Sequence, residues 1–302
     1  MSTEASAASG LSWDVTSDVD QLFTYHFMVN ALWAGTIVAV MAALIGWFMV
    51  LRRQTFAGHT LSIVAFPGAT GATLIGLPAL AGYFAFCAGS ALVLAAVGGG
   101  GPRARSHESA ATGTLQALAL AFGFLFVSLY GGVLQDLTTV LFGTFLGISD
   151  GQVLVLLGVA AISIAALFLL ARPLLFASVD PEVARARAVP VRGLSIGFLL
   201  LLGLSVAATA QITGALLVFA LLVTPAGTAQ TLTARPGLGL ALSVAIALLV
   251  TWLGLGIAFF SPYPVGFWVT SLSFGLFVVA RVARALAGRR HARDRVALAE
   301  AG

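Results

Sequence analysis

The sequence predicts an all-α polytopic membrane protein with eight or nine transmembrane helices. Hydrophobic side chains make up 60% of its 302 residues and charged side chains only 9%, whereas an average soluble domain carries about a quarter charged residues. Its apolar runs are continuous over about 20 residues, the length that a spanning helix needs. A membrane β-barrel would alternate apolar and polar residues instead, so the pattern excludes that class.

Nine apolar runs follow a polar segment over 1–26. This segment contains four acidic residues and no arginine, unlike the basic start of a cleavable signal, so we expect the first run to be an uncleaved anchor. The second run is the weakest, because it is short and contains Pro67 and Gly68. Only a few polar residues around Gly214 separate the sixth run from the seventh, which leaves eight or nine spans. The runs cover 27–51, 61–77, 79–97, 112–132, 153–171, 193–213, 215–232, 238–260 and 266–284.

The arginines predict the orientation in a bacterial plasma membrane. Lysine is absent and the net charge of +4 depends on 15 arginines, and short cytoplasmic loops retain arginine. With the N-terminus outside and nine spans, every arginine lies in a cytoplasmic segment or, for Arg281 and Arg284, at the inner end of the last helix. The sequence therefore predicts an extracytoplasmic tail over 1–26, a transmembrane domain over 27–285 and a basic cytoplasmic tail over 286–302.

Composition also excludes several functions. A phosphate-binding loop of the G-x-x-x-x-G-K-[ST] kind needs the lysine that this chain lacks. The arginines are spread over several loops, whereas a nucleic-acid-binding protein clusters them on one face. No charged residue lies near the centre of a run, which argues against a proton-coupled carrier. The runs hold no Ser/His or paired-Asp constellation, so we do not expect an intramembrane enzyme.

The longest predicted cytoplasmic loop, 172–192, carries the signals of a short helix. It has an aspartate for the N-cap, a proline for the first turn, a glutamate near the positive end of the helix dipole and arginines near its negative end. A segment that only links two membrane spans would not need residues that cap a helix. The segment is therefore either a helix on the bilayer surface or a docking element for a cytoplasmic partner. The residues are Asp180, Pro181, Glu182, Arg185 and Arg187.

Four stretches resemble the permease subunits of ATP-binding-cassette (ABC) uptake systems for zinc, manganese and iron. Residues 50–68 are similar to the family's V-L-R-R…G-D-A-L-S-H-A…P-G, and residues 141–149 to its L-F-G-x-x-L-x-x-S. Residues 180–184, which end at Ala184, are similar to its D-P-E-x-A loop. Residues 214–229 are similar to G-x-L-L-x-x-A-L-L-x-x-P-A-x-x-A. The resemblance runs from about residue 27 to residue 285.

The resemblance implies the fold of a metal-type ABC importer permease, which is a transporter subunit and not an enzyme. It implies two permease copies in the lipid membrane, cytoplasmic ABC ATPase subunits that bind the ATP, and an extracytoplasmic solute-binding protein. No cofactor is implied for the chain itself. The helix from Asp180 to Arg187 would be the coupling helix that contacts the ATPase.

The chain departs from the family at the residues that are thought to ligate the ion in transit. The family has Asp and His four residues apart, and here these positions hold His59 and Ile63. Isoleucine offers no donor atom, whereas a cation needs several nitrogen or oxygen ligands. His59 is therefore the candidate metal ligand, with the alternative that it only caps the inner end of the second helix.

A second departure is Ala188, which stands where the family usually has a glycine after the coupling helix. That position suits a left-handed C-cap, so alanine there should either cost about 1 kcal/mol or make the helix end differently. Small residues and prolines within the runs are expected either to pack helices or to shape the pathway. They are Pro67, Gly68, Ala72 and Pro225.

Three functions agree with these observations. The first is a permease that imports zinc, manganese or iron. The second is a related ABC permease for a metal chelate or haem, for which apolar walls would suffice. The third is a membrane scaffold that does not transport. This function would be supported if the chain still assembled with its partners but did not stimulate the ATPase.

Cysteine labelling tests the predicted orientation. We expect a cysteine introduced by Ser6→Cys to react with a membrane-impermeant reagent from outside the cell. A cysteine introduced by Ala299→Cys is expected to react only after the membrane is permeabilised. The reverse labelling pattern would contradict the orientation that the arginines predict.

Overall fold

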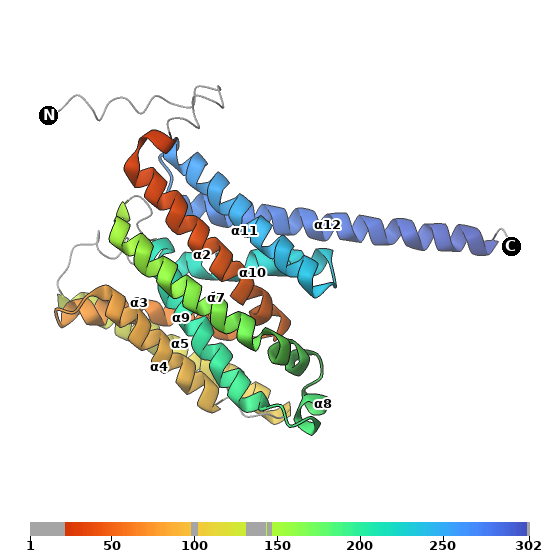
Figure 1. Cartoon of the computed structure of the whole chain (residues 1–302), viewed down its shortest axis with the longest axis horizontal. Helices are drawn as coiled ribbons and strands as arrows, with labels where there is room; N and C mark the ends of the chain where they lie inside the picture. Colours follow the sequence, from red (N-terminus) through yellow and green to blue (C-terminus); the bar gives the residue numbers. More distant parts are fainter. Residues whose placement is uncertain (1–21, 98–101, 131–142, 144–146, 301–302) are drawn as a thin grey trace.

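The computed structural model describes residues 22–97, 102–130, 143 and 147–300, and these residues form a bundle of α-helices without strands (Figure 1). The expected tail over 1–26 lies almost entirely outside them, as does most of the stretch 141–149. The helices are α2 (His26–Leu51), α3 (Thr55–Leu74), α4 (Ala79–Val97), α5 (Pro102–Tyr130), α7 (Asp150–Val179), α8 (Pro181–Ala186), α9 (Val191–Thr213), α10 (Ala215–Leu232), α11 (Pro236–Phe259) and α12 (Val265–Glu300).

Nine long helices of the described part coincide with the nine apolar runs, so the all-helical polytopic fold is confirmed. Seven are long and apolar enough to cross a membrane, and the apolar part of α10 is shorter. Helix α3 is not among these seven. The total of eight or nine spans therefore stays a prediction. The seven are α2, α4, α7, α9 and α11, with the apolar parts of α5 and α12.

Helical structure extends beyond the apolar runs at several places. Helix α3 begins six residues before its run and continues through Pro67, although proline removes one backbone hydrogen bond. Helix α7 continues through Pro173 to Val179, so the expected loop 172–192 is largely helical. Helix α12 reaches Glu300 and projects beyond the bundle (Figure 1), so residues 286–300 of the expected tail over 286–302 continue that helix. Hydropathy therefore predicts which part of a helix lies in the membrane, but it does not predict the residues at which the helix begins and ends.

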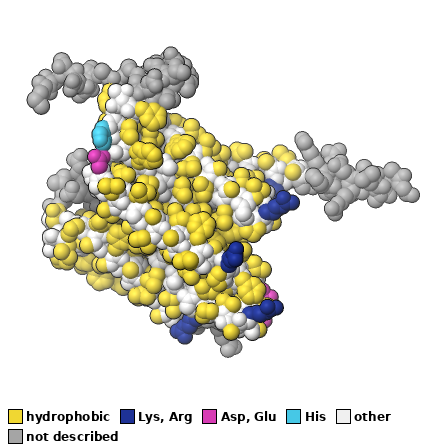
Figure 2. Space-filling model, in the orientation of Figure 1, with side chains coloured by type: hydrophobic (Ala, Val, Ile, Leu, Met, Phe, Trp, Pro, Cys, Tyr) yellow, Lys and Arg dark blue, Asp and Glu magenta, His cyan; other side chains and the backbone are white. Residues whose placement is uncertain are grey.

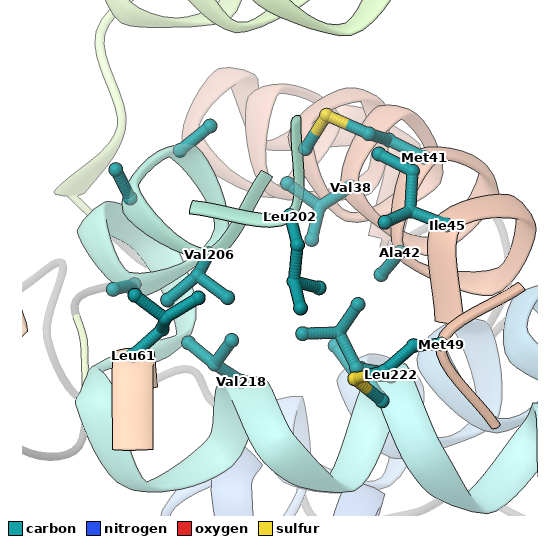
Figure 3. Close-up of a cluster of buried hydrophobic side chains, with 14 of the residues drawn as sticks. Val38, Met41, Ala42, Ile45, Met49, Leu61, Leu202, Val206, Val218 and Leu222 are labelled. Carbon is teal, nitrogen blue, oxygen red and sulfur yellow. The ribbon is translucent and has the colours of Figure 1, made fainter. Parts of the chain in front are cut away.

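Helix α2 lies at the centre of the core, where it packs against α7, α9, α10 and α11. Figure 3 shows its apolar side chains beside Leu202 of α9 and Leu222 of α10, and the same buried cluster continues to Leu61 of α3, Val206 of α9 and Val218 of α10. All of these side chains are buried. The contributing side chains of α2 are Val38, Met41, Ala42, Ile45 and Met49.

The outer surface of the bundle is apolar, as a surrounding of lipid requires. Figure 2 shows hydrophobic side chains over most of the visible face. Arginine side chains lie toward α8 and the projecting part of α12, whereas a histidine and an acidic side chain lie at the opposite end, beside the start of α2. The charge asymmetry that the sequence predicts is thus also a spatial asymmetry of the described residues.

Small residues let neighbouring helices approach closely. A Cβ on Gly82 of α4 would lie 1.9 Å from the carbonyl oxygen of Gly68 in α3 and 2.7 Å from the Cβ of Ala72. Gly76, one turn further on, has φ +76° and follows the end of α3. The stripe of small residues on α3 therefore serves both helix packing and helix termination.

Adding one methyl group at this crossing is expected to destabilise the protein. Gly82→Ala forces the two helices apart, which should cost about 1–3 kcal/mol. Gly89→Ala in the same helix is the matched control, because nothing lies within 4 Å of its added Cβ, and it should be neutral or stabilising by up to about 1 kcal/mol. Thermal unfolding of the purified protein measures both, and equal midpoints would contradict the close α3–α4 crossing.

Candidate functional site

The predicted coupling segment forms helix α8 between the ends of α7 and α9. The carboxylate of Asp180 accepts hydrogen bonds from the backbone N–H groups of Glu182 and Val183 at 3.1 and 3.0 Å. Pro181 occupies the first turn, where its missing N–H costs nothing. The cap, the proline and the position of the helix are those that the sequence predicts.

The exposed side chains of α8 form a surface at one end of the bundle. Glu182, Arg185 and Arg187 are all exposed, and Val183 is 44% exposed. Ala184 is fully buried and anchors the helix to the bundle. This surface joins one acidic, two basic and one apolar side chain, which suits contact with a protein partner.

Helix α8 ends with a residue in the left-handed conformation. Ala188 has φ +58°. Its N–H donates to the carbonyl of Arg185 at 3.0 Å, and the N–H of Val189 donates to the carbonyl of Ala184 at 3.0 Å. These two bonds define a Schellman motif, in which glycine is the usual residue at the left-handed position. The sequence leaves two outcomes open at this position, a strained left-handed residue or a different helix end, and the structure has the left-handed residue.

His59 lies in the second turn of α3, facing α10. Its ring centroid is 4.7 Å from that of Phe219, its side chain is half-buried, and its Nδ1 is buried without a hydrogen-bond partner. Gln54 is the N-cap residue of α3. The alternative that His59 caps this helix is therefore wrong, because the helix begins several residues earlier than its apolar run.

One protomer does not supply a complete set of metal ligands within the described residues. No group of three or more His, Cys, Asp and Glu side chains there could hold a metal ion. Ile63, one turn after His59, is half-buried and contributes no donor. Any ion at this position must take further ligands from water, from a second copy of the chain or from its own chelator.

The small residues and prolines that the sequence predicts for packing or pathway are all buried. Pro67 is buried inside α3, and Gly68 and Ala72 face α4. Pro225 is buried inside α10. Its missing N–H leaves the carbonyl of Leu221 without the usual helical partner. Gly68 and Ala72 thus pack α3 against α4, and a role of the four residues in the pathway stays a prediction.

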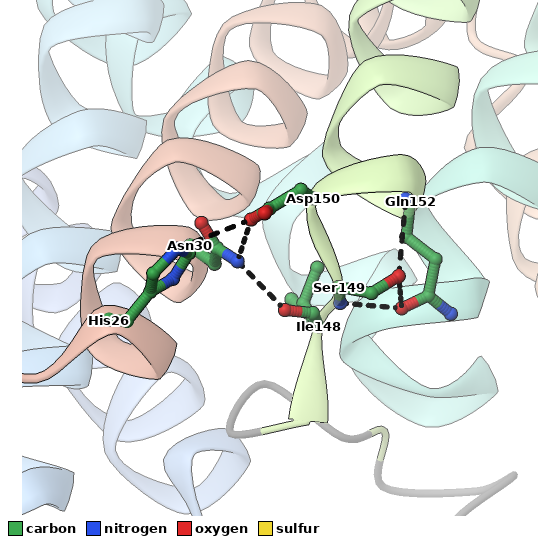
Figure 4. Close-up of polar contacts among 6 residues, drawn as sticks. All are labelled: His26, Asn30, Ile148, Ser149, Asp150 and Gln152. Atoms are coloured by element: carbon green, nitrogen blue, oxygen red, sulfur yellow. Dashed lines mark hydrogen bonds and ion pairs between the residues drawn. The ribbon is translucent and has the colours of Figure 1, made fainter.

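A polar cluster joins α2 to α7 at the end opposite to α8 (Figure 4). The amide nitrogen of Asn30 donates to the carbonyl of Ile148 at 3.1 Å and to a carboxylate oxygen of Asp150 at 2.6 Å. The Nε2 of His26 lies 3.7 Å from the same carboxylate oxygen. Sequence reasoning missed this cluster, because its members are more than 100 residues apart and each side chain alone is unremarkable at a helix end.

Residues 24–284 match the ABC 3 transport family. The chain belongs to this family. As an ABC 3 permease it is a multi-pass membrane transport protein and not an enzyme, and the family that its sequence predicts is confirmed.

The ABC 3 permease is similar to curated transport proteins and to a solved structure. It is 33% identical to the manganese transport system membrane protein MntC of Halalkalibacterium halodurans over 74% of this chain and 75% of that protein. It is 31% identical to the chelated iron transport system membrane protein YfeC of Yersinia pestis over 86% of this chain and 87% of that protein. The structure of PsaBC from Streptococcus pneumoniae in complex with Fab matches with a TM-score of 0.78 and 25% identity, over 88% of this chain and 95% of that one.

The strained end of α8 gives a prediction for this permease. Ala188→Gly should stabilise α8 by about 1 kcal/mol, because glycine adopts positive φ without a Cβ clash. Ala186→Gly, in the same helix at an ordinary helical position, should destabilise it by a similar amount, about 1 kcal/mol. Hydrogen exchange of the backbone amides of α8 should slow in the first variant and accelerate in the second. Faster exchange in both variants would rule out the left-handed conformation at residue 188.

Proposed function

We propose that this permease imports a transition-metal ion across the bacterial plasma membrane, with manganese and iron as the first candidates. The observation that carries the proposal is the similarity to manganese and chelated-iron permeases over roughly three quarters or more of the chain. The absence of a lysine-containing phosphate-binding loop supports ATP hydrolysis on a separate subunit. The chain then needs no cofactor of its own.

The working unit in this proposal is a dimer of the chain with its N-termini outside. Helix α8 contacts a cytoplasmic ABC ATPase, and an extracytoplasmic solute-binding protein delivers the metal to the opposite end. The arginines of the described part favour this orientation, since they gather toward α8 and α12. A dimer is also favoured by His59, because two copies would bring two imidazoles to one path.

The proposed transit position is His59. Its half-buried imidazole has one nitrogen without a protein partner, and a neutral imidazole nitrogen is the commonest protein ligand of metals such as zinc and iron. The tilted Phe219 ring at 4.7 Å restricts the orientation of this imidazole. The ion would hold its remaining ligands loosely, which suits passage better than tight coordination at a structural site.

A second candidate substrate is a metal chelate. It is favoured by Ile63, which offers no donor where the family has a ligand, and by the similarity to a chelated-iron permease. A chelated ion brings its own oxygen or nitrogen ligands and needs fewer from the protein. Apolar and small side chains would then suffice along the path.

Uptake into proteoliposomes tests both substrates. The vesicles contain the permease with its ATPase and receive the metal-loaded binding protein, and uptake of free Mn²⁺ is compared with uptake of an iron–citrate chelate. For a bare ion, His59→Ala should lower uptake about tenfold or more, since even outer-shell partners of a metal ligand contribute that much. Thr60→Ala is the matched control, because its hydroxyl only bonds back to the carbonyl of Phe56 within α3.

Ile63→His separates the two substrates. It restores a donor one turn after His59 on the same helical face, and two histidines at this spacing can bind one ion. If the natural substrate is a chelate, the parent protein should import iron–citrate and gain Mn²⁺ uptake only with Ile63→His. Strong Mn²⁺ uptake that is unaffected by His59→Ala would instead contradict the transit position.

A further inference from the structure

Arg52 differs from the other arginines whose side chains the structure describes. It is the C-cap residue of α2, and its side chain is half-buried. The exposed arginines resemble the ordinary solvated charges of a cytoplasmic loop. They are Arg53, Arg172, Arg185, Arg187, Arg192, Arg235, Arg281 and Arg284.

The guanidinium of Arg52 is held by neutral groups. Its Nε donates to the side-chain oxygen of Gln54 at 3.1 Å, its Nη1 to the hydroxyl of Ser178 at 3.3 Å and its Nη2 to the hydroxyl of Ser195 at 2.7 Å. Its central carbon lies 5.4 Å from the centre of the Phe198 ring. Burial lowers the pKa of Arg52, yet arginine stays charged in proteins. Among the described residues no carboxylate forms an ion pair with it.

These partners belong to the segments on both sides of α8. Ser178 lies in the last turn of α7, two residues before the Asp180 cap, and Ser195 lies near the start of α9. Gln54 is the N-cap residue of α3, the helix that carries His59. One side chain therefore joins the two attachments of α8 to the end of α2 and the start of α3. The planar fork of arginine can reach several acceptors at fixed angles, which lysine cannot do.

We propose that Arg52 is a positioning residue that transmits movement of α8 to α2 and α3, and thereby couples the ATPase to the transit position. This inference rests on the proposed function, in which α8 contacts the ATPase. A displacement of α8 shifts Ser178 and Ser195 together, and Arg52 passes the shift to both helices. Neutral partners suit such a linkage, because breaking one of its bonds leaves no unpaired carboxylate in the interior.

A purely structural role would give a different result from a transmitting one. If Arg52 only stabilises the fold, substituting it would lower both the stability of the protein and its assembly with the ATPase. A transmitting residue would leave assembly intact and lower the response of the ATPase to the loaded binding protein. The ratio of stimulated to basal ATP hydrolysis separates these two cases.

The test uses the full complex of permease, ATPase and binding protein in lipid nanodiscs, with Mn²⁺ or iron–citrate as the probe. Arg52→Lys keeps the charge and removes the fork. Arg53→Asn is the matched control, because it removes the adjacent exposed charge at a residue with φ +58°, a conformation that asparagine tolerates. Glu182→Arg, on the exposed face of α8, shows how the complex behaves when α8 no longer binds the ATPase. Co-purification, basal ATPase activity and stimulated ATPase activity are measured for each.

We expect Arg52→Lys to co-purify with the ATPase and to keep its basal activity within about twofold, while stimulation falls about tenfold, as loss of a hydrogen bond to a charged group implies. Arg53→Asn should match the wild type, and Glu182→Arg should lose the ATPase. Ser195→Ala, which leaves Arg52 intact, should also reduce stimulation. Combining Ser195→Ala with Arg52→Lys should lower stimulation little further, because both substitutions remove the hydrogen bond between Arg52 and Ser195.

Two results would overturn the inference alone. The first is that the wild-type complex is active and Arg52→Lys is stimulated as fully as the wild type. The second is that Arg52→Lys loses the ATPase during purification, as Glu182→Arg does, which would make Arg52 part of the docking structure. A wild-type complex that shows neither stimulation nor uptake with either probe would instead defeat the proposed function, and this inference with it.

Discussion

Helix α2 can be buried along most of its length because its neighbours meet it through small residues. Lipid provides no hydrophobic force between helices, so their association depends on close packing and interhelical hydrogen bonds. A Cβ on Gly46 would lie 1.9 Å from the carbonyl oxygen of Leu222 in α10. On another side, Ala39 and Ala43 pack against Ala247 of α11. Because these contacts leave no room for larger residues, α2 fixes the positions of α10 and α11.

Polar contacts add to the attachment of α2 that close packing provides. The hydroxyl of Ser243 donates to the carbonyl of Ala43 at 3.2 Å, and the amide of Gln230 donates to the carbonyl of Trp47 at 2.8 Å. Helix α7, much of which faces outward, is held to α2 at both ends, through Asn30 at one end and Arg52 at the other. Since α8 directly follows α7, its position depends on the same central helix.

The sequence predicts the fold more fully than it predicts the site. Apolar runs of the length of a membrane span identify all nine long helices, because each run reflects contact with lipid or core. The cap at Asp180 is also predictable, because it is a local property of a few adjacent residues. The left-handed conformation at Ala188 is only one of the two outcomes that the sequence leaves open. The start of α3 is not predictable, because residues 55–60 are helical without being apolar. The contacts of Arg52 are equally hidden, because its hydroxyl partners on α7 and α9 lie more than 120 residues away.

Strain in the described backbone is concentrated at the end of the bundle that carries α8. Arg53 and Ala188 both have φ +58°, and they are the non-glycine residues with positive φ in the described part. Both end a helix through a Schellman motif, and Gly76 does the same after α3 without strain. A left-handed non-glycine residue persists only where its surroundings enforce it. Arg53 directly follows Arg52, and Ala188 separates α8 from α9, so both strained turns border the linkage through Arg52. The turn after α8 and the turn before α3 are therefore less relaxed than the turn at the other end of α3, because they place an alanine and an arginine where glycine would be unstrained.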